Sequence, residues 1–309
     1  MTSSRKRKIQ IALGLVWLAD GILQMQPKMF GNGFLTQVID PAAQGQPSLI
    51  AGAINKTGNF VQPHVSMWNL LFAAVQVLIG IGMLSRQTVK PAIALSVAWS
   101  LGVWSFGEGF GMLLTGSATA LNGAPGAVLL YAIIGILVWP KAVATEELLS
   151  HKNGLRIWSV LWVGSGVLFL LPGNSGSDSI SRALSSAAGN VPGPIAGIDR
   201  SLSAGLMGHG TQASIVLAVV SAVIGLGPIL TKAPNLFLMF GAALSLDFWV
   251  TGQALGGLFT GTATDPNAGP LFVLLATALA VPAELKVLAQ RSNSNSGGFL
   301  WGLPTPVAG

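Results

Sequence analysis

The sequence lacks cysteine and carries few charges. None of its 309 residues is a cysteine, which excludes disulfides, thiolate metal sites and a cysteine nucleophile. Charged residues make up 8% of the chain, against about 25% in an average soluble domain. Hydrophobic residues reach 51%, which is too many for a disordered chain. The composition therefore excludes an ordinary cytosolic enzyme and predicts a protein of the lipid bilayer.

Long apolar runs in the sequence predict membrane helices. A helical span needs about 20 mostly apolar residues, whereas strands of a membrane barrel alternate apolar and polar positions. The runs in this chain are continuous, so they favour an all-α polytopic protein. We expect eight spans, at residues 9–27, 66–85, 91–115, 124–140, 157–172, 211–231, 234–260 and 270–288.

The distribution of lysine and arginine predicts the orientation. Loops rich in these residues stay on the cytoplasmic side. With the N-terminus inside, only Lys28, Lys56, Arg182 and Arg200 of the 16 basic residues lie outside. We therefore expect a multi-pass protein of the inner or plasma membrane with both termini in the cytoplasm. This asymmetry accounts for the net charge of +6 without nucleic acid, and the Arg5–Lys8 cluster is interpreted as an anchor beside anionic lipid.

The chain matches itself, without gaps, when it is shifted by 145 residues. The matching pairs include Trp17 and Trp162, Gly21 and Gly166, His64 and His209, Trp104 and Trp249, and Gly111 and Gly256. Four spans in each half would point both halves the same way, so we expect parallel repeats related by an axis along the membrane normal.

The repeat divides the chain into four parts. The first four-helix repeat is expected at 9–140, a cytoplasmic linker at 141–156, the second repeat at 157–288 and a flexible cytoplasmic tail at 289–309. Each repeat has one long outer loop between its first and second spans. Loops of this length are usually functional or contain small helices.

The acidic residues Asp20, Glu108 and Asp247 lie inside predicted spans. Intramembrane carboxylates are energetically costly and mark functional sites by default. The alternative is that each carboxyl is protonated or hydrogen-bonded within the scaffold. The repeat partner of Glu108 is Gln253, so the two halves share a scaffold but differ in charge.

Glu108 and its surroundings form the first candidate binding site. On a continuous helix Glu108 would share one face with Trp104 and Met112, and Gln253 would share the equivalent face with Trp249. The sequence predicts a small solute or ion, with copper and protons among the candidates, in the outer half of the membrane. The glycines at 107–111 and 252–256 are interpreted as close helix-packing positions within these spans.

Two equivalent histidines form the second candidate site. His64 and His209 each begin the second span of their repeat, with Met67 and Met112 also near outer span ends. Imidazole and thioether groups suit copper, and two facing histidines suit haem. The alternative is an interfacial histidine that was copied when the repeat was duplicated.

The unit of one span, a long outer segment and three closely spaced spans resembles the DoxX-like superfamily of four-helix membrane proteins. The likeness rests on Leu15-Val-Trp17-Leu-Ala-Asp-Gly21 and Val160-Leu-Trp162-Val-Gly-Ser-Gly166, each followed by a proline, Pro27 or Pro172. The resemblance implies membrane redox chemistry or quinone association, often with a soluble or membrane redox partner. No functional residue is carried over, and no arginine stands in the first span, where many members have one.

Three functions stay open from the sequence. The first is a membrane protein that binds or moves a small solute or ion. The second is a membrane subunit of a quinone-linked or haem/metal redox system. The third is an accessory or structural subunit of a membrane complex. The sequence contains no Ser/His/Asp set, HExxH or Walker motif, which favours binding over catalysis.

Overall fold

The computed structural model describes residues 2–140 and 148–281, and every regular element within these ranges is helical. The start of the predicted linker, the end of the eighth predicted span and the predicted tail lie outside the described residues. The first half contains α1 (Ser3–Gln24), η1 (Pro27–Phe30), α2 (Asn32–Phe34), η2 (Leu35–Ile39), α3 (Asp40–Ala43), α4 (Ser48–Val61), η3 (Gln62–His64), α5 (Val65–Leu84), α6 (Val89–Phe106), η4 (Phe110–Thr115), η5 (Ala120–Asn122) and α7 (Ala127–Leu137). The second half contains α8 (His151–Phe169), α9 (Ser179–Ala187), α10 (Gly193–Leu206), α11 (Gly210–Leu230), α12 (Pro234–Val250), η6 (Ala254–Gly257) and α13 (Ala268–Leu279).

Three helical segments of the described chain are long and apolar enough to cross a membrane. They are Ser48–Leu84, which joins α4, η3 and α5, then α6, and then α11. The apolar helices α7, α12 and α13 are shorter. Each predicted span falls on a helix, but the third and seventh were expected to continue to residues 115 and 260. The helices end at Phe106 and Val250 instead, and this difference changes the candidate site.

Small residues allow the first two long helices of each half to pack closely. Helix α1 lies along α5, and α8 lies along α11. A Cβ atom added to Gly80 would lie 2.8 Å from the carbonyl oxygen of Gly14, and one on Gly166 would lie 2.8 Å from that of Ala218. These backbones therefore touch at positions where only glycine leaves room.

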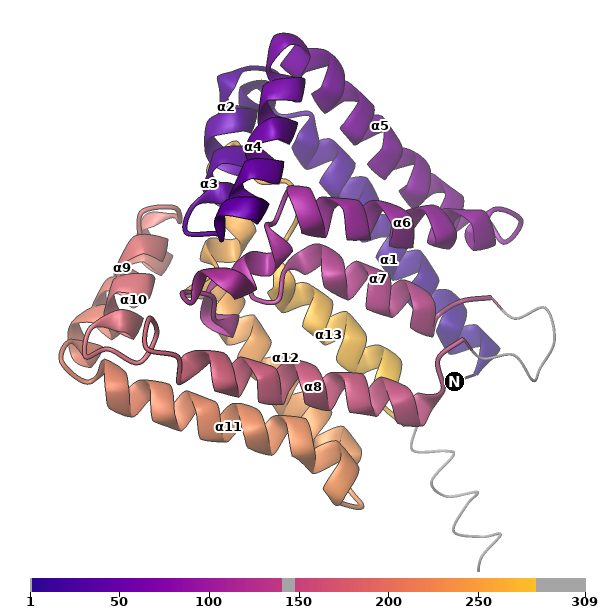
Figure 1. Cartoon of the computed structure of the whole chain (residues 1–309). Helices are drawn as coiled ribbons and strands as arrows, with labels where there is room; N and C mark the ends of the chain where they lie inside the picture. The colour runs from indigo at the N-terminus through magenta and orange to yellow at the C-terminus, as the bar shows by residue number, and fades with distance from the viewer. Residues whose placement is uncertain (1, 141–147, 282–309) are drawn as a thin grey trace, which may run out of the picture. The chain divides into compact units, whose positions relative to one another are not determined.

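Helices α7 and α13 pack against each other at the centre of the described chain (Figure 1). Helix α1 also contacts both of them, and α6 and α12 each cover one of the pair. Both central helices bury residues on most sides, including Leu130 and Ile134 of α7 and Leu271 and Leu275 of α13. A helix that is apolar all round is typical of a buried position, so the two short apolar helices form the core where the two halves meet.

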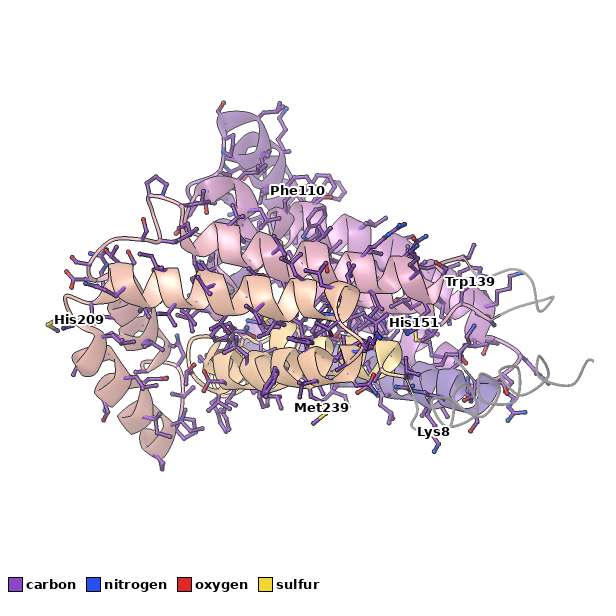
Figure 2. All side chains as sticks on the ribbon, turned by 90° about the horizontal axis from the view of Figure 1, so that it is seen from below. Lys8, Phe110, Trp139, His151, His209 and Met239 are labelled. Atoms are coloured by element: carbon purple, nitrogen blue, oxygen red, sulfur yellow. The ribbon has the colours of Figure 1, made fainter. Side chains whose placement is uncertain are left out.

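The basic N-terminal residues hold the ends of other helices. The Arg7 Nη1 atom donates to the Met83 carbonyl oxygen at 2.8 Å, and the Lys6 Nζ atom donates to the Trp139 carbonyl oxygen at 3.1 Å. Carbonyl groups at a helix C-terminus lack intrahelical partners and attract cations. Lys8, Trp139 and His151 lie at this end of the helices, and His209 lies at the other (Figure 2). The cluster interpreted as a lipid anchor therefore also ties α1 to α5 and α7.

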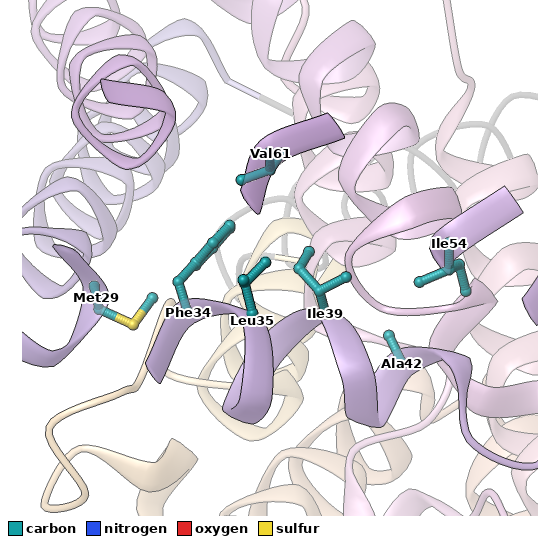
Figure 3. Close-up of a cluster of buried hydrophobic side chains, with 7 residues drawn as sticks. All are labelled: Met29, Phe34, Leu35, Ile39, Ala42, Ile54 and Val61. Atoms are coloured by element: carbon teal, nitrogen blue, oxygen red, sulfur yellow. The ribbon is translucent and has the colours of Figure 1, made fainter. Parts of the chain in front are cut away.

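Small helices build the long segments after α1 and α8, as the sequence analysis expected. The segment after α1 has its own apolar cluster, formed by Met29, Phe34, Leu35, Ile39, Ala42, Ile54 and Val61 (Figure 3). In the segment after α8, Ile180 and Leu184 of α9 pack with Phe169 and Phe248. Each segment is thus folded onto the helices beside it.

Candidate functional site

The turn that follows α6 carries Glu108. The backbone takes positive φ angles at Gly109 (52°), Phe110 (58°), Gly111 (62°) and Met112 (58°), so the helix cannot continue. A Cβ on Gly111 would collide with the carbonyl oxygen of Pro125. The helical face that was predicted to join Glu108 with Met112 is therefore wrong, because these residues lie on a turn. The glycines at 107–111 serve this turn rather than helix crossing.

The Glu108 carboxylate caps the beginning of α7. Its Oε1 atom accepts a hydrogen bond from the Val128 N–H at 3.3 Å. Amide groups in the first turn of a helix have no intrahelical acceptor and favour a negative group. The second oxygen, Oε2, is buried and has no hydrogen-bond partner among the described residues. Glu108 thus caps the first turn of α7 with one oxygen, and its second oxygen lies buried against Gly126.

Gln253 caps α13 in the same manner, but without a charge. Its Oε1 atom accepts from the Gly269 N–H at 3.1 Å, and its Nε2 atom donates to the Ala120 carbonyl oxygen at 2.9 Å. Both polar ends of the amide are therefore used. The two caps therefore differ: the oxygen and the nitrogen of Gln253 each make a hydrogen bond, whereas one oxygen of Glu108 makes none among the described residues.

The two tryptophans of the predicted site fix the turns that precede α7 and α13. Trp104 Nε1 donates to the Pro125 carbonyl oxygen at 2.8 Å, and Trp249 Nε1 donates to that of Pro266 at 2.6 Å. Each indole thereby positions the helix start that Glu108 or Gln253 caps. The structure gives Trp104 and Trp249 a scaffold role beside the site.

A cavity of about 1540 Å³ opens beside these caps. Segments of both halves line it, and the lining includes Glu108, Gln253, Asp265, Lys28, Asn122 and Thr262. The Lys28 Nζ atom donates to the Thr260 carbonyl oxygen at 2.7 Å. Asp265 accepts from the Asn267 N–H at 2.7 Å and from the Thr264 hydroxyl at 3.0 Å. Of the two acids in the lining, Glu108 is therefore the one with an oxygen that accepts no hydrogen bond among the described residues.

Asp265 holds its proton more tightly than a free carboxyl. Burial raises the pKa of Asp265, while the hydrogen bonds from Asn267 and Thr264 act in the opposite direction. A cation bound beside Asp265 would favour its ionised form.

Asp20 lies deeper, between α1 and α7. The Tyr131 hydroxyl donates to its Oδ2 atom at 2.6 Å, while its Oδ1 atom is buried and without a partner among the described residues. Asp20 is not among the residues that line the cavity. It is the best buried of the predicted acids.

Asp247 lies apart from the cavity, on the exposed side of α12. Its charge acts on Asp199, a buried acid that the sequence did not predict as a site residue. Asp199 of α10 is 0% exposed, and neither of its carboxylate oxygens has a partner in the described part of the chain. Burial raises the pKa of Asp199, and the charge of Asp247 raises it further. Its repeat partner is Ile54, which is also 0% exposed and belongs to the cluster of Figure 3. When the sequence is shifted by 145 residues, Asp199 stands opposite Ile54, and this difference is the signal that could have identified Asp199.

We expect replacement of Asp199 by valine to stabilise the protein. The change removes a buried acid without partners, whose desolvation costs about 1–3 kcal/mol, and puts an apolar side chain where the first half has one. The apparent Tm in detergent should rise. The reciprocal control, Ile54→Asp, should lower it, and a lower Tm for Asp199→Val would show that the acid has a stabilising partner.

The histidines and methionines of the second predicted site do not come together. His64 and His209 are exposed at the starts of α5 and α11, which lie on opposite sides of the central helices (Figure 1). Met67 lies near His64 beside a smaller cavity, whereas the sulfur of Met112 accepts from Gln46 Nε2 at 3.5 Å. Among the described residues, no three His, Asp or Glu side chains are grouped to hold a metal.

Comparisons with protein-family models, curated proteins and solved structures find no match to this chain.

Proposed function

We propose that this chain is a multi-pass membrane protein that binds a small organic cation in the cavity beside Glu108. In this proposal it crosses the membrane eight times, as two parallel four-helix repeats with both termini in the cytoplasm, and the cavity opens on the outer side. The observation that carries the proposal is the side chain of Glu108 in the lining of the cavity, a carboxylate with one oxygen that has no hydrogen-bond partner among the described residues.

Exposed apolar ridges support the membrane setting. Leu78 and Ile81 of α5 and Val216 and Val219 of α11 are all more than half exposed, on helices long enough to cross a bilayer. Soluble monomers seldom expose apolar areas of this kind, whereas lipid covers them without cost. The basic residues at one end of the helices fit the cytoplasmic side of such a protein.

Matching elements support the duplication. Adding 145 to the first residues of α4, α5 and α6 gives the first residues of α10, α11 and α12. The fourth helices depart from this register, because α7 begins at Ala127 and α13 at Ala268, which are 141 residues apart. The shorter spacing also relates Pro125 to Pro266 and Val128 to Gly269, the residues that the paired tryptophans and caps contact.

The charges and size of the cavity favour an organic cation. Glu108 and Asp265 supply two carboxylates against the single ammonium of Lys28, which leaves an excess of negative charge. Amide and hydroxyl groups such as those of Asn122 and Thr262 offer further acceptors. The volume lies above the roughly 300–1,000 Å³ typical of small-molecule sites, so the cavity has room for more than a bare ion.

The redox hypothesis rests on the DoxX-like outline, and the copper and haem hypotheses rest on His64 and His209. A visible spectrum and elemental analysis of the purified protein test all three. The accessory-subunit hypothesis predicts that the purified chain binds none of the probes below.

Replacement of Glu108 by glutamine should remove most of the cation binding while the protein stays folded. The amide oxygen can still accept from Val128, but the negative charge that attracts the cation is lost. Hydrogen bonds to charged groups contribute about 1.5–3 kcal/mol, so the affinity should fall by about tenfold or more. Isothermal titration of the purified full-length protein with methylammonium chloride measures this change.

The matched control is Asp40→Asn, which removes one negative charge from an exposed residue outside the cavity lining. This variant should bind methylammonium as the unaltered protein does. Equal affinity in the Glu108→Gln variant would contradict the proposal. Loss of binding in both variants would show that the cation responds only to net charge.

A further inference from the structure

A buried acid–phenol pair lies behind the cavity. Asp20 is 1% exposed and Tyr131, the only tyrosine of the chain, is 0% exposed. The Tyr131 hydroxyl donates to Asp20 Oδ2 at 2.6 Å, and the Oδ1 atom has no partner among the described residues. The cation site proposed above does not use either residue.

The second half of the protein shows what the scaffold needs at this place. There the ring of Trp162 packs on Phe272 with centroids 5.4 Å apart, and in the first half Trp17 packs on Tyr131 at 4.5 Å. Phe272 corresponds to Tyr131 under the 141-residue spacing of the fourth helices. The same packing is thus made without a hydroxyl.

The acid is also replaced in the second half. Ser165 stands where Asp20 does in the repeat, and its hydroxyl donates to the Leu161 carbonyl oxygen of its own helix at 2.8 Å. Serine and phenylalanine therefore satisfy the packing of this helix pair. The carboxyl and the phenol of the first half are additions that the fold itself does not require.

The pair is electrostatically connected with the cavity. Tyr131 follows Val128, the residue that Glu108 caps, by three positions, which is less than one turn of α7. The hydrogen bond from Tyr131 to Asp20 therefore joins the pair to the helix whose first turn Glu108 caps. A charge bound beside Glu108 would act on the pair through this buried, low-dielectric part of the protein.

No other charged side chain of the neighbouring helices balances the pair. Helices α5, α7 and α13, which pack against α1, contain no Asp, Glu, Lys or Arg, and the charged residue of α6, which packs against α7, is Lys90 in its exposed first turn. The nearest basic residue on α1 is Lys8, twelve positions away, or about 18 Å along the helix. At the cavity, Lys28 is the cation of the lining, and its ammonium group is bonded to Thr260.

We infer that Asp20 and Tyr131 form a proton-exchange site, which releases one proton when a cation enters the cavity. The inference rests on the cation site proposed above. In the empty protein the Asp20 carboxyl carries the proton. When the cation arrives, the O–H bond of this carboxyl breaks, its electron pair stays on the carboxylate and the proton leaves to the solvent. The Tyr131 hydroxyl stabilises the carboxylate by its hydrogen bond, because a donor to the charged form favours ionisation.

The exchange of a cation for a proton is the chemistry of an antiporter. A positive charge near an acid favours its ionised form, and by linkage a bound proton opposes cation binding to the same extent. The affinity for the cation should therefore rise with pH in the range where Asp20 exchanges its proton.

Proton release is measured by titrating the purified full-length protein with methylammonium chloride in phosphate and in HEPES buffer. These buffers differ in ionisation enthalpy, so the difference in heat counts the protons released. The Asp20→Asn and Tyr131→Phe variants should bind methylammonium but release about one proton fewer than the unaltered protein. The matched control in the second half, Phe272→Tyr, should release as many protons as the unaltered protein.

The outcomes distinguish the two proposals. Equal proton release in the unaltered protein and in Asp20→Asn overturns the proton-exchange site and leaves the cation site standing. Absence of any binding heat in the unaltered protein overturns the cation site, and the proton-exchange site falls with it. The apparent Tm of each variant must stay near that of the unaltered protein, as the Ser165 and Phe272 pair leads us to expect.

Discussion

Replacement of Gly111 by alanine should destabilise the protein by about 2–5 kcal/mol. The left-handed backbone at this residue costs about 1–2 kcal/mol for any residue with a Cβ atom. The added methyl group would also collide with the Pro125 carbonyl, and an overpacked site typically costs a further 1–3 kcal/mol or so. The turn must move away from Pro125, which also displaces Glu108 from α7. Thermal unfolding in detergent measures the change in stability.

The variant Gly116→Ala separates the two causes. Gly116 has a similar φ angle of 75°, but a Cβ atom there would meet nothing within 4 Å. We expect Gly116→Ala to lower the free energy of unfolding only by the cost of the left-handed backbone, about 1–2 kcal/mol. Equal losses in the two variants would mean that the approach of Pro125 does not constrain the turn.

Of the two exchanges at the paired caps, replacement of Gln253 by glutamate should destabilise the protein more than Glu108→Gln. It should lower the free energy of unfolding by about 1–3 kcal/mol. The Nε2 atom of Gln253 donates to the Ala120 carbonyl oxygen, and a carboxylate would place an acceptor against this acceptor. Glu108→Gln should leave stability almost unchanged, because the contact with Val128 is retained. The pair of exchanges therefore tests which half has the specialised cap.

The loss caused by Gln253→Glu should diminish as the pH is lowered. A protonated carboxyl can donate to Ala120 again, so the folded form would bind the proton more tightly than the unfolded form. Stability then falls as the pH rises through the range where this proton is lost. Thermal unfolding at acidic and neutral pH measures the effect, and an equal loss at both would rule out the acceptor–acceptor contact as its cause.

The sequence predicted the helices better than the places where they end. Each predicted span falls on an apolar helix, whereas α4 and α10, which are longer than α7, lie in the predicted outer loops. Hydropathy could not reveal the end of α6, because Phe110 and Met112 are apolar residues in a left-handed conformation. This conformation depends on the segment that carries Pro125, which comes later in the chain.

Part of the candidate site was also predictable. The exchange of Glu108 for Gln253 within a repeat marked an acid that the scaffold does not need. The contact of Glu108 with Val128 was not predictable, because it depends on the turn after α6, where the sequence predicted a continuous helix. Asp199 was not predictable in the same way, because it lies outside the predicted spans, on a helix of the segment after α8.

Because α7 is short, the membrane voltage should affect the binding of a cation at its end. With 11 residues, α7 is about 16 Å long, roughly half of a hydrocarbon core of about 30 Å. In the proposed topology Glu108 caps the outer end of α7, so a cation that reached this carboxylate from outside would have entered the electric field rather than stopped at the surface. If about half of the field is crossed, 100 mV changes the binding free energy by roughly 1 kcal/mol, so the resting potential of the cell itself would draw the cation to its site.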